Sequence, residues 1–569
     1  MGEVEVIGGP ITAAQAACLI AYILFVALWS YAELLAYRGH QAEAARHPHS
    51  DATNEEEMVP IMVHGDTNGT LDSSSKDAMK SAAAPTSSSD KNAATAAKDP
   101  STSAATAAYS SRSSGFIQTT FFRLLALDPL ALSSCREALR ASVEMGTIIL
   151  WFYVADRTPA IAAGPKEYIR DVFLFMFLVL TLVAGSYTLK KGRAPVLVNR
   201  QQTEEWKGWM QVLFLLYHYY EAREAYNAIR IFIASYVWMT GFGNFAYYYK
   251  TRDFSLGRFC QMMWRLNFLA FLCCAALDNQ YMLYYICPMH TLYTIMVYAA
   301  LGLWRGGNDS LWGLGVKIFL CFGVVIGVWE IKSVFYAMWA PFQFLLGYTD
   351  PRRPNPDAMH EWYFRTGLDR YIWIHGMICA YLHPKFEAWL KSMDTQTPTK
   401  RRAIRALLAV SAVTAGYVWY VNVYTLPKLE YNKLHPFTSW IPITAFLTLR
   451  NITPSFRLHA MGLYGWLGCI TLETYVAQYH TWLLSKVPNS QPIYLLTLLP
   501  GYPLLNFSAV TAIYIFLSHR MFELTASLRD ALIPHDDDAL LGRNLATMSL
   551  GAAALWGIGF LVKEGVKAL

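Results

Sequence analysis

Long apolar stretches alternate with short polar connections along most of this chain. Ten stretches are long enough to cross, or nearly cross, about 30 Å of hydrocarbon at about 1.5 Å per residue. They lie near residues 12–36, 171–189, 226–246, 264–278, 280–303, 315–341, 404–425, 459–484, 492–518 and 545–562. Shorter or more polar candidates lie near residues 141–155, 206–222, 371–383 and 436–450. We therefore predict an all-α, polytopic helix bundle in the lipid bilayer, with about ten to fourteen transmembrane or re-entrant helices.

Composition agrees with a membrane location. Of the 569 residues, 54% are hydrophobic and 15% are charged, against about 25% charged in soluble domains. Basic loops at Lys190, Lys191 and Arg193 and at residues 400–405 favour the cytoplasmic side. The cysteines lie mostly within apolar runs and form no C-x-x-C pair, so we expect neither a disulfide framework nor a metal site. The sequence has no P-loop or zinc-protease motif, and nothing in it points to nucleic-acid binding.

The chain divides into three regions by composition. Residues 1–39 contain the first apolar segment, which we predict to be a retained span or signal anchor. Residues 40–115 are rich in Ser, Ala and Thr and predict a disordered loop, since they cannot bury enough apolar surface to offset ordering entropy. This loop holds a possible glycosylation acceptor at Asn68, usable only in a secretory lumen. Residues 116–569 are predicted to form the multi-span membrane domain.

A polar stripe marks one of the more polar helix candidates. Lys207, Gln211, Phe214, His218 and Glu221 follow steps of four and three, which places them on one helical face. Such a stripe must face a protein interior or a water-filled cavity. A buried histidine is favoured in its neutral form, so His218 could act as a general base for a hydroxyl, with Glu221 orienting its ring. The alternative is a structural histidine bonded to a carbonyl.

Glu473 and His480 form a second polar group inside an apolar run. They are seven residues apart, so they share a helical face about 10.5 Å apart along the axis. The spacing predicts that they line one cavity at two depths. The alternative is interhelical hydrogen bonding, which membrane bundles use routinely.

A third group combines charges with aromatic residues. Glu361, Arg365 and Asp369 are spaced by four, which predicts an ion-pair ladder on a helix at the membrane surface. Arg365 and Arg370 could instead hold the phosphates of an anionic donor.

A fourth group surrounds a proline. Asp278, Pro288 and His290 lie in and beside an apolar stretch. A proline with polar neighbours in a span is typical of a broken helix that lines a cavity, or of a simple kink.

Several of these motifs occur together and in order in one known family. They lie at residues 203–211, 217–218, 229–230, 238–245, 265–268, 284–291, 368–371, 435–436, 472–475 and 478–480. This pattern resembles the reduced wall acetylation proteins, the plant and algal branch of a ten-span family that also includes fungal capsule and animal sialic acid O-acetylation proteins. The resemblance covers roughly residues 117–535 and the first span.

The resemblance implies a multi-pass Golgi membrane protein needed for O-acetylation of cell-wall polysaccharides. The donor substrate would be cytosolic acetyl-CoA, with no tightly bound cofactor. Animal members carry a soluble esterase-like domain after the first span, where this chain has residues 40–115. The resemblance therefore implies a separate luminal polysaccharide O-acetyltransferase as a partner, beside the polysaccharide acceptor itself.

We combine these inferences into one mechanistic hypothesis. His218, or else His480, would act as general base or carry the acetyl group, and carboxylates would position and polarise the reactants. The catalytic candidates are His218, His480, Glu205, Glu221 and Glu473. The candidate residues for donor or substrate binding are Lys207, Trp206, Arg230, Asp278, His290, Arg365 and Arg370, with Lys190 and Lys191 as further contacts for the donor phosphates.

Two other functions remain open from the sequence. The chain could transport intact acetyl-CoA, or another acetyl donor, to separate luminal O-acetyltransferases. It could also be a non-catalytic scaffold, although burying several ionisable groups would then bring no evident benefit.

Overall fold

The computed structural model describes residues 11–46, 123–124, 126–535 and 537–568. The chain divides into two units, of which the smaller is Ser30–Ser133 and the larger is Met1–Trp29 with Ser134–Leu569. Helix α1 (Ala13–Arg46) extends beyond residue 39, where we predicted that the first span ends and the loop begins. The rest of the predicted loop as far as residue 115, with the glycosylation tripeptide at Asn68, lies outside the described residues.

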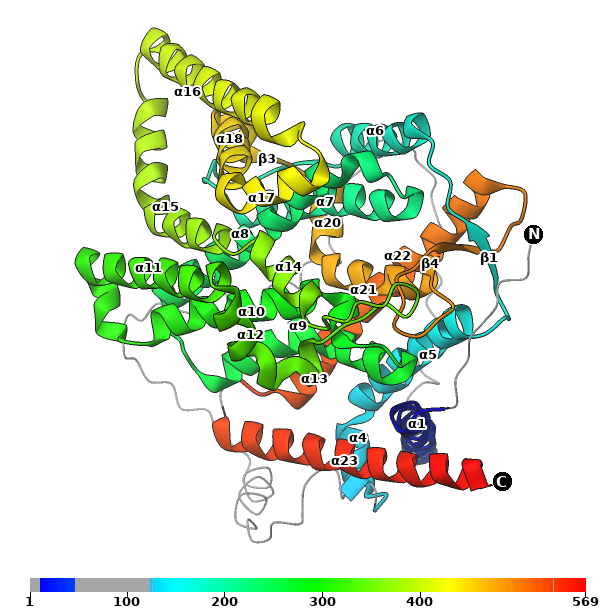
Figure 1. Cartoon of the computed structure of the whole chain (residues 1–569). Coiled ribbons are helices and arrows are strands. Elements are labelled where there is room, and N and C mark those ends of the chain that lie inside the picture. Colours follow the sequence, from blue (N-terminus) through cyan, green and yellow to red (C-terminus); the bar gives the residue numbers. More distant parts are fainter. Residues whose placement is uncertain (1–10, 47–122, 125, 536, 569) are drawn as a thin grey trace, which may run out of the picture. The chain divides into compact units, whose positions relative to one another are not determined.

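The larger unit is mostly helical, as Figure 1 shows. Its long helices and the short α-helices between them have the following bounds: α4 (Pro129–Ser134, beginning in the smaller unit), α5 (Arg136–Arg157), α6 (Arg170–Tyr187), α7 (Arg200–Tyr220), α8 (Tyr226–Thr251), α9 (Leu256–Leu277), α10 (Ile286–Gly302), α11 (Leu311–Val325), α12 (Lys332–Trp339), α13 (Gln343–Leu346), α14 (His360–Leu368), α15 (Ile372–Asp394), α16 (Pro398–Trp419), α17 (Lys428–Thr438), α18 (Trp440–Asn451), α19 (Pro454–Leu458), α20 (Gly462–Cys469), α21 (Thr471–Thr481), α22 (Pro503–Leu532) and α23 (Asp538–Ala568). The described residues of this unit also form five short strands: β1 (Ala162–Pro165), β2 (Leu189–Lys191), β3 (His459–Met461), β4 (Leu483–Leu484) and β5 (Tyr494–Thr497).

The predicted membrane segments correspond to these helices. Every segment near which we predicted a span contains a helix, and seven helices among the described residues are long and apolar enough to cross a membrane. The all-α polytopic fold is thus confirmed. Two segments differ from the prediction. Residues 492–502 are not helical, because β5 occupies part of them and α22 begins at Pro503. The run 459–484 is not one helix, because it begins in β3, ends in β4 and holds both α20 and α21.

Pro288 does not kink a helix. It lies in the first turn of α10, where the missing backbone N–H has no intrahelical partner to lose. The preceding helix α9 ends at Leu277, and Asp278 caps it with a left-handed φ of 55°. The apolar residues on either side of Asp278 therefore form two separate helices, α9 and α10, joined by a connection.

Glycines allow the central helices to approach closely. A Cβ on Gly208 of α7 would collide with the Tyr464 carbonyl of α20, and one on Gly468 of α20 would collide with the Glu204 carbonyl of α7. The same reciprocal arrangement joins α8 and α15, through Gly241 and Gly376. Small residues at such crossings let membrane helices pack tightly, so these two pairs fix the framework around α7 and α8.

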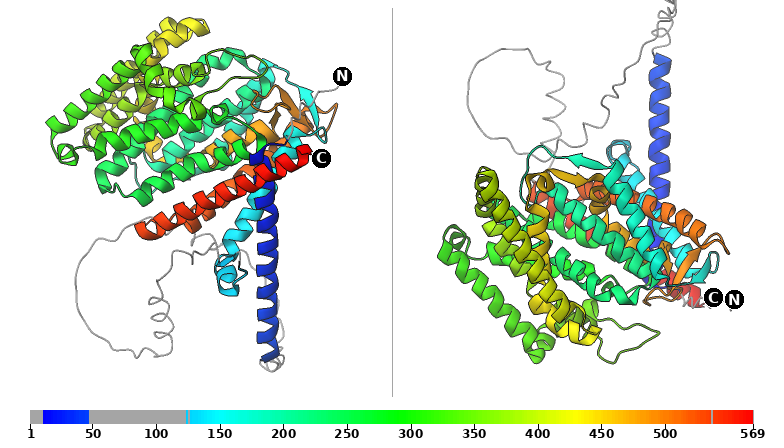
Figure 2. Two further views of the ribbon diagram at one scale, coloured as in Figure 1. Left: turned by 60° about the horizontal axis from the view of Figure 1, so that its bottom comes forward. Right: turned by 90° about the horizontal axis from the view of Figure 1, so that it is seen from above.

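Connections gather at two ends of the larger unit. At one end, β2 pairs antiparallel with β3, and Arg457 binds both the Pro195 carbonyl and the Asp394 carboxylate. We call residues 188–200, 394–405 and 450–461 the basic end. At the other end, β1, β5 and β4 form an antiparallel sheet, and we call residues 158–168, 221–226, 278–285, 348–357, 424–428 and 483–497 the sheet end. Helix α7 runs from the basic end to the sheet end, among helices that lie side by side in Figure 2.

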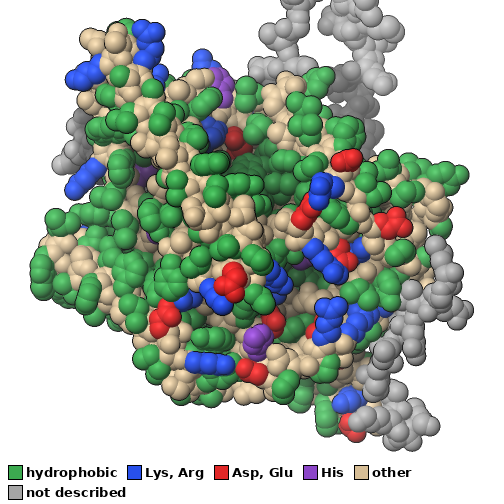
Figure 3. Space-filling model, turned by 45° about the horizontal axis from the view of Figure 1, so that its top comes forward, with side chains coloured by type: hydrophobic (Ala, Val, Ile, Leu, Met, Phe, Trp, Pro, Cys, Tyr) green, Lys and Arg blue, Asp and Glu red, His purple; other side chains and the backbone are tan. Residues whose placement is uncertain are grey.

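The surface of the larger unit is strongly apolar. Large hydrophobic side chains are exposed along several helices, among them Phe175, Leu182, Leu407 and Leu561. Figure 3 shows broad hydrophobic areas on one face, with the charged side chains gathered in groups. Monomeric soluble proteins rarely expose such continuous apolar area, so this surface fits contact with lipid.

Candidate active site

A small cavity lies where α7 reaches the sheet end. Its volume is about 160 Å³, and its walls come from α7, α8, α14, α17, α21 and two connections of the sheet end. The lining residues are Phe214, Tyr217, His218, Tyr226, Ile229, Arg230, Ile233, Tyr285, Phe364, Arg365, Lys428, Tyr479 and Gln491. Three of the sequence-predicted site residues, His218, Arg230 and Arg365, thus meet at one place.

His218 occupies the last turn of α7. Its ring packs edge-on against Phe214, with ring centroids 4.6 Å apart, and against Tyr217 at 5.0 Å. Its imidazole makes no hydrogen bond to any described residue, and its remaining accessible surface lines the cavity. The ring nitrogens of His218 are therefore available to a bound molecule.

Lys166 holds this turn in place. Its Nζ donates to the carbonyl oxygen of His218 at 3.0 Å and to that of Pro492 at 2.9 Å. Burial lowers the pKa of Lys166 to about 8, although the nearby Glu221 opposes this shift. Lys166 thus joins the residues before α6, the end of α7 and the connection after β4.

Arg230 of α8 supplies buried donors to the same cavity. Its Nη2 donates to the Asp369 carboxylate at 2.8 Å, while Nε and Nη1 have no hydrogen-bond partner among the described residues. Asp369 also lies 3.5 Å from Nε2 of His435, and Nδ1 of His435 lies 2.9 Å from the Tyr431 hydroxyl. A buried guanidinium with unused N–H groups is costly unless a ligand completes it.

Arg365 of α14 also lines the cavity. Its Nε donates to Glu361 at 3.0 Å, as the predicted spacing of four requires, and its guanidinium lies 4.3 Å from the Tyr285 ring centroid. The predicted ladder does not continue to Asp369, because α14 ends at Leu368 and Asp369 turns to Arg230. Arg370 does not line this cavity: it pairs with Glu330 at 2.7 Å.

This arrangement suits acyl transfer to a hydroxyl. An imidazole with an available nitrogen can take the proton of an attacking hydroxyl. Fixed N–H donors of Arg230 could stabilise the negative oxygen that forms on the acyl carbon. Apolar and aromatic walls would keep bulk water away from both groups.

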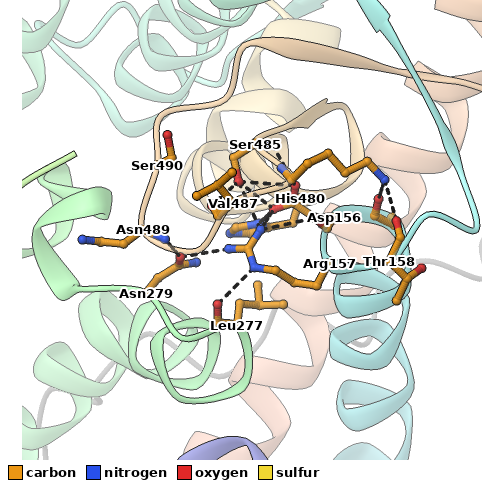
Figure 4. Close-up of polar contacts among 12 residues, drawn as sticks. Asp156, Arg157, Thr158, Leu277, Asn279, His480, Ser485, Val487, Asn489 and Ser490 are labelled. Carbon is orange, nitrogen blue, oxygen red and sulfur yellow. Dashed lines mark hydrogen bonds and ion pairs between the residues drawn. The ribbon is translucent and has the colours of Figure 1, made fainter. Parts of the chain in front are cut away.

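His480 lies in a different setting, shown in Figure 4. Its Nδ1 lies 2.8 Å from Asp156, and its Nε2 lies 2.6 Å from the Tyr284 hydroxyl, so both nitrogens are engaged. Asp156 also accepts from Arg157 at 2.5 Å and from the backbone N–H of Ser485 at 2.7 Å. This buried network is saturated, which favours a structural role for His480.

Glu473 is likewise committed to an ion pair. It lies fully buried on α21 and binds the guanidinium of Arg265 from α9, with one contact at 3.0 Å. Neither Glu473 nor His480 lines the small cavity; Tyr479 of the same helix does. The two residues therefore join α21 to different helices and do not line one cavity at two depths.

A larger apolar groove lies at the basic end. Its volume is about 580 Å³, and its lining residues are Gly185, Leu189, Glu205, Trp209, Phe446, Leu449, Arg450, Ser455, Phe456, His459, Ala460 and Met461. Glu205 pairs with Arg450 at 3.1 Å and accepts the Met461 N–H at 2.8 Å. Lys190 and Lys191 lie on β2, which pairs with β3 beside the groove.

The other predicted residues do not line either cavity. Trp206 packs against Phe446 of α18, and Lys207 pairs with Glu204 at 2.6 Å. His290 bonds to the Thr240 hydroxyl at 2.7 Å within the helix bundle.

Glu221 and Asp278 lie at helix ends. Glu221 follows the end of α7 with a φ of 54° and pairs with Arg223 at 2.5 Å, so its carboxylate is directed to Arg223 and does not orient the His218 ring. Asp278 is exposed at the end of α9.

Sequence reasoning missed several residues of the cavity and its support. Lys428, Tyr479 and Gln491 come from segments far from His218 in the chain, and no spacing links them to it. Lys166 stands in a polar connection without a motif. For Asp156 and Arg157 the sequence does contain a signal, because an adjacent pair of opposite charges stands at the end of an apolar helix.

Comparisons with known proteins agree with this chemistry. Residues 79–545 match the model of the ten-span acyl transferase domain found in Cas1p. The chain is also 31% identical over 425 residues to the N-acetylneuraminate (7)9-O-acetyltransferase of Danio rerio, covering 72% of this chain and 52% of the relative. It thus spans about half the length of the curated relative, and no solved structure matches it significantly. The match over most of its length shows that this chain belongs to the ten-span acyltransferase family of Cas1p.

Proposed function

We propose that this chain is a membrane O-acetyltransferase that takes acetyl from cytosolic acetyl-CoA and passes it across the Golgi membrane for O-acetylation of cell-wall polysaccharides. Family membership and the O-acetyltransferase relative support the reaction class. The resemblance to the reduced wall acetylation branch supports the polysaccharide acceptor and the Golgi.

The observation that carries the proposal is the setting of His218. Its imidazole makes no hydrogen bond among the described residues, and it shares a cavity with unused N–H donors of the buried Arg230. His480 offers no such nitrogen, since Asp156 and Tyr284 engage both of its ring nitrogens. His218 is therefore the residue that can act as base or carry the acetyl group.

The transfer proceeds at the acyl carbon of the donor. The acceptor hydroxyl attacks this carbon while His218 takes its proton, and Arg230 N–H groups stabilise the resulting oxyanion. The carbon–sulfur bond then breaks, and the departing thiolate receives the proton from His218, which leaves an acetyl ester and free thiol. In the carrier variant, the imidazole attacks first and holds the acetyl group until the hydroxyl displaces it.

The two cavities lie at the two ends of the bundle and would bind different parts of the donor. Glu205 lines the groove at the basic end and His218 lines the small cavity, so about 20 Å along α7 separates them. Basic connections favour the cytoplasmic side, so we assign the phosphate-bearing coenzyme to the groove, which has Arg450 in its wall and Lys190 and Lys191 on the neighbouring strand β2. The small cavity holds about 160 Å³, against about 300 Å³ or more for sites that enclose whole drug-sized ligands. It therefore takes the acetyl thioester end of the donor and not the whole coenzyme.

Purified protein in lipid nanodiscs, with labelled acetyl-CoA and cell-wall oligosaccharides, tests this assignment. His218→Ala should lower acetyl transfer by about 100-fold or more, the usual contribution of a general base. His375→Ala is the matched control, because His375 is a partly buried helix histidine that lines neither cavity. Full activity in His218→Ala, with a correctly folded protein, would contradict the role of His218.

A further inference from the structure

Arg230 is held by one side of its guanidinium group. Its Nη2 donates to Oδ2 of Asp369 at 2.8 Å, whereas Nε and Nη1 have no hydrogen-bond partner among the described residues. The side chain of Arg230 is 1% exposed, so bulk solvent does not orient it. The orientation of Arg230 therefore depends on how firmly the Asp369 carboxylate is itself held.

The backbone of Asp369 is fixed by the helices around it. Asp369 follows the end of α14, and its N–H donates to the Thr366 carbonyl at 3.3 Å. Helix α15 comes next and crosses α8, the helix of Arg230, where Gly376 lies against the Trp238 carbonyl. This crossing sets the distance of Asp369 from α8, but it leaves the rotation of the carboxylate open.

His435 of α17 engages the second oxygen of that carboxylate. Its Nε2 lies 3.5 Å from Oδ1 of Asp369, and its Nδ1 lies 2.9 Å from the Tyr431 hydroxyl. Tyr431 is also tied to α8, since its hydroxyl lies 3.1 Å from the Asn227 carbonyl, one turn before Arg230. We call Tyr431, His435, Asp369 and Arg230 the Arg230 relay. All four side chains are buried.

Charge balance assigns the protons within the Arg230 relay. Asp369 and Arg230 neutralise each other, so a charged His435 would add an unpaired cation in the protein interior. A neutral ring donates from Nε2 to Asp369 when the Tyr431 hydroxyl donates to Nδ1. The Asn227 carbonyl already accepts along α8 and so competes less for the hydroxyl hydrogen. The relay thus supports both oxygens of Asp369 from behind.

We propose that His435 and Asp369 are positioning residues for Arg230, which hold its unused N–H groups towards the acyl oxygen in the cavity that His218 lines. This inference rests on the proposed function, in which Arg230 stabilises the oxyanion. An oxyanion donor is effective because it is fixed before the charge develops, and a displacement of about 1 Å can cost about 100-fold in rate. Because Arg230 is supported on one side, its position is sensitive to the groups behind Asp369.

Steady-state kinetics of acetyl transfer per folded molecule in nanodiscs, with labelled acetyl-CoA and cell-wall oligosaccharides, tests the proposal. His435→Leu removes the donor to Asp369, whereas the amide of His435→Gln can replace Nε2. We expect His435→Leu to lower kcat about tenfold, less than the roughly 100-fold or more that loss of an oxyanion donor costs. KM for acetyl-CoA should stay within about twofold, because the Arg230 relay does not line the groove assigned to the coenzyme. His435→Gln should recover most of the rate.

A double-mutant cycle with Arg230→Lys separates positioning from general packing. A lysine keeps the charge that pairs with Asp369 but lacks the planar fork whose orientation matters. His435→Leu should therefore cost less than about twofold in the Arg230→Lys protein.

The tyrosine at the outer end of the relay offers a milder change with a matched control. Tyr431→Phe should lower kcat about fivefold, as loss of one hydrogen bond predicts. Tyr464→Phe should leave kcat unchanged, because it removes an equally buried hydroxyl, bonded to Thr181 at 2.6 Å, from a side chain that lines neither cavity.

Equal costs of His435→Leu in the wild-type and Arg230→Lys proteins would overturn the inference. Equal rates for His435→Leu and His435→Gln, or for Tyr431→Phe and Tyr464→Phe, would do the same. A rise in KM with unchanged kcat would assign His435 to donor binding instead. A wild-type protein that transfers no acetyl would refute the proposed function itself, and this inference with it.

Discussion

Replacement of Asp156 by asparagine separates structural from catalytic roles of the His480 network. Asp156 is fully buried and accepts hydrogen bonds from Arg157, from His480 and from the backbone N–H of Ser485. An asparagine keeps one oxygen acceptor, but in either orientation its NH₂ group faces hydrogen-bond donors, namely Arg157 with His480 or the backbone N–H groups of Ser485 and Lys486. The buried Arg157, 7% exposed, then lacks a counter-ion.

The structure sets the size of the effect. Breaking one side of a buried ion pair typically costs about 3–5 kcal/mol, because the remaining charge stays buried and unpaired. Arg157 keeps contacts to Asn279 and to the Leu277 carbonyl, so we expect a loss near the lower figure, about 3 kcal/mol. The protein should still fold at low temperature, since the helix crossings at Gly208 and Gly241 are untouched.

Thermal unfolding and acetyl transfer should be measured on the same nanodisc samples. We expect Asp156→Asn to lower the melting temperature by several degrees, while transfer per folded molecule, measured well below that temperature, stays within about twofold. Asp278→Asn is the control, because Asp278 is an exposed carboxylate at the end of α9. An unchanged melting temperature together with loss of transfer would refute the structural role and return His480 to the reaction.

Two further changes probe packing and pH dependence. Gly208→Leu should abolish the yield of folded protein in size-exclusion chromatography, because its side chain would collide with the Tyr464 backbone; Gly243→Leu, with open space around it, should fold normally. Burial lowers the pKa of Lys166 from 10.5 to about 8. Below pH 8 the amine is charged in both the folded and the unfolded state, and the folded state bears the full cost of burying that charge. This cost falls as the pH rises from 8 towards 10.5, so the stability of the folded state rises over the same range. Lys166→Met should remove that pH-dependent gain in the melting temperature; an identical rise in wild type and variant would contradict it.

The sequence predicted the helices well because hydropathy dominates in a membrane chain. It placed His218 on a helix with polar neighbours, but it could not show that Lys207 turns to Glu204 or that Gln211 bonds to Thr474. Those contacts depend on tertiary packing, which periodicity does not contain. His218 differs from Lys207 and Gln211 because its imidazole has no hydrogen-bond partner within the part of the chain that the structure describes, and only the three-dimensional structure shows this.

Helix ends explain the other differences between the predicted and the observed contacts. The spacing of Glu361, Arg365 and Asp369 assumed one continuous helix, yet α14 ends at Leu368 and frees Asp369 to bind Arg230. Glu221 seemed one turn from His218, but α7 ends at Tyr220. Helix ends are set by local caps and by neighbouring segments, so a spacing rule fails where a helix stops.

The most direct test of transmembrane acetyl transfer uses the purified chain in sealed liposomes, oriented with the basic end outward. Acetyl-CoA labelled separately on the acetyl group and on the coenzyme is supplied outside, and an acceptor oligosaccharide is enclosed. We expect acetyl label alone to reach the enclosed sugar, and we expect His218→Ala but not His375→Ala to abolish this transfer. Entry of both labels together would instead identify an acetyl-CoA transporter, and entry of neither would contradict transmembrane acetyl transfer by this chain.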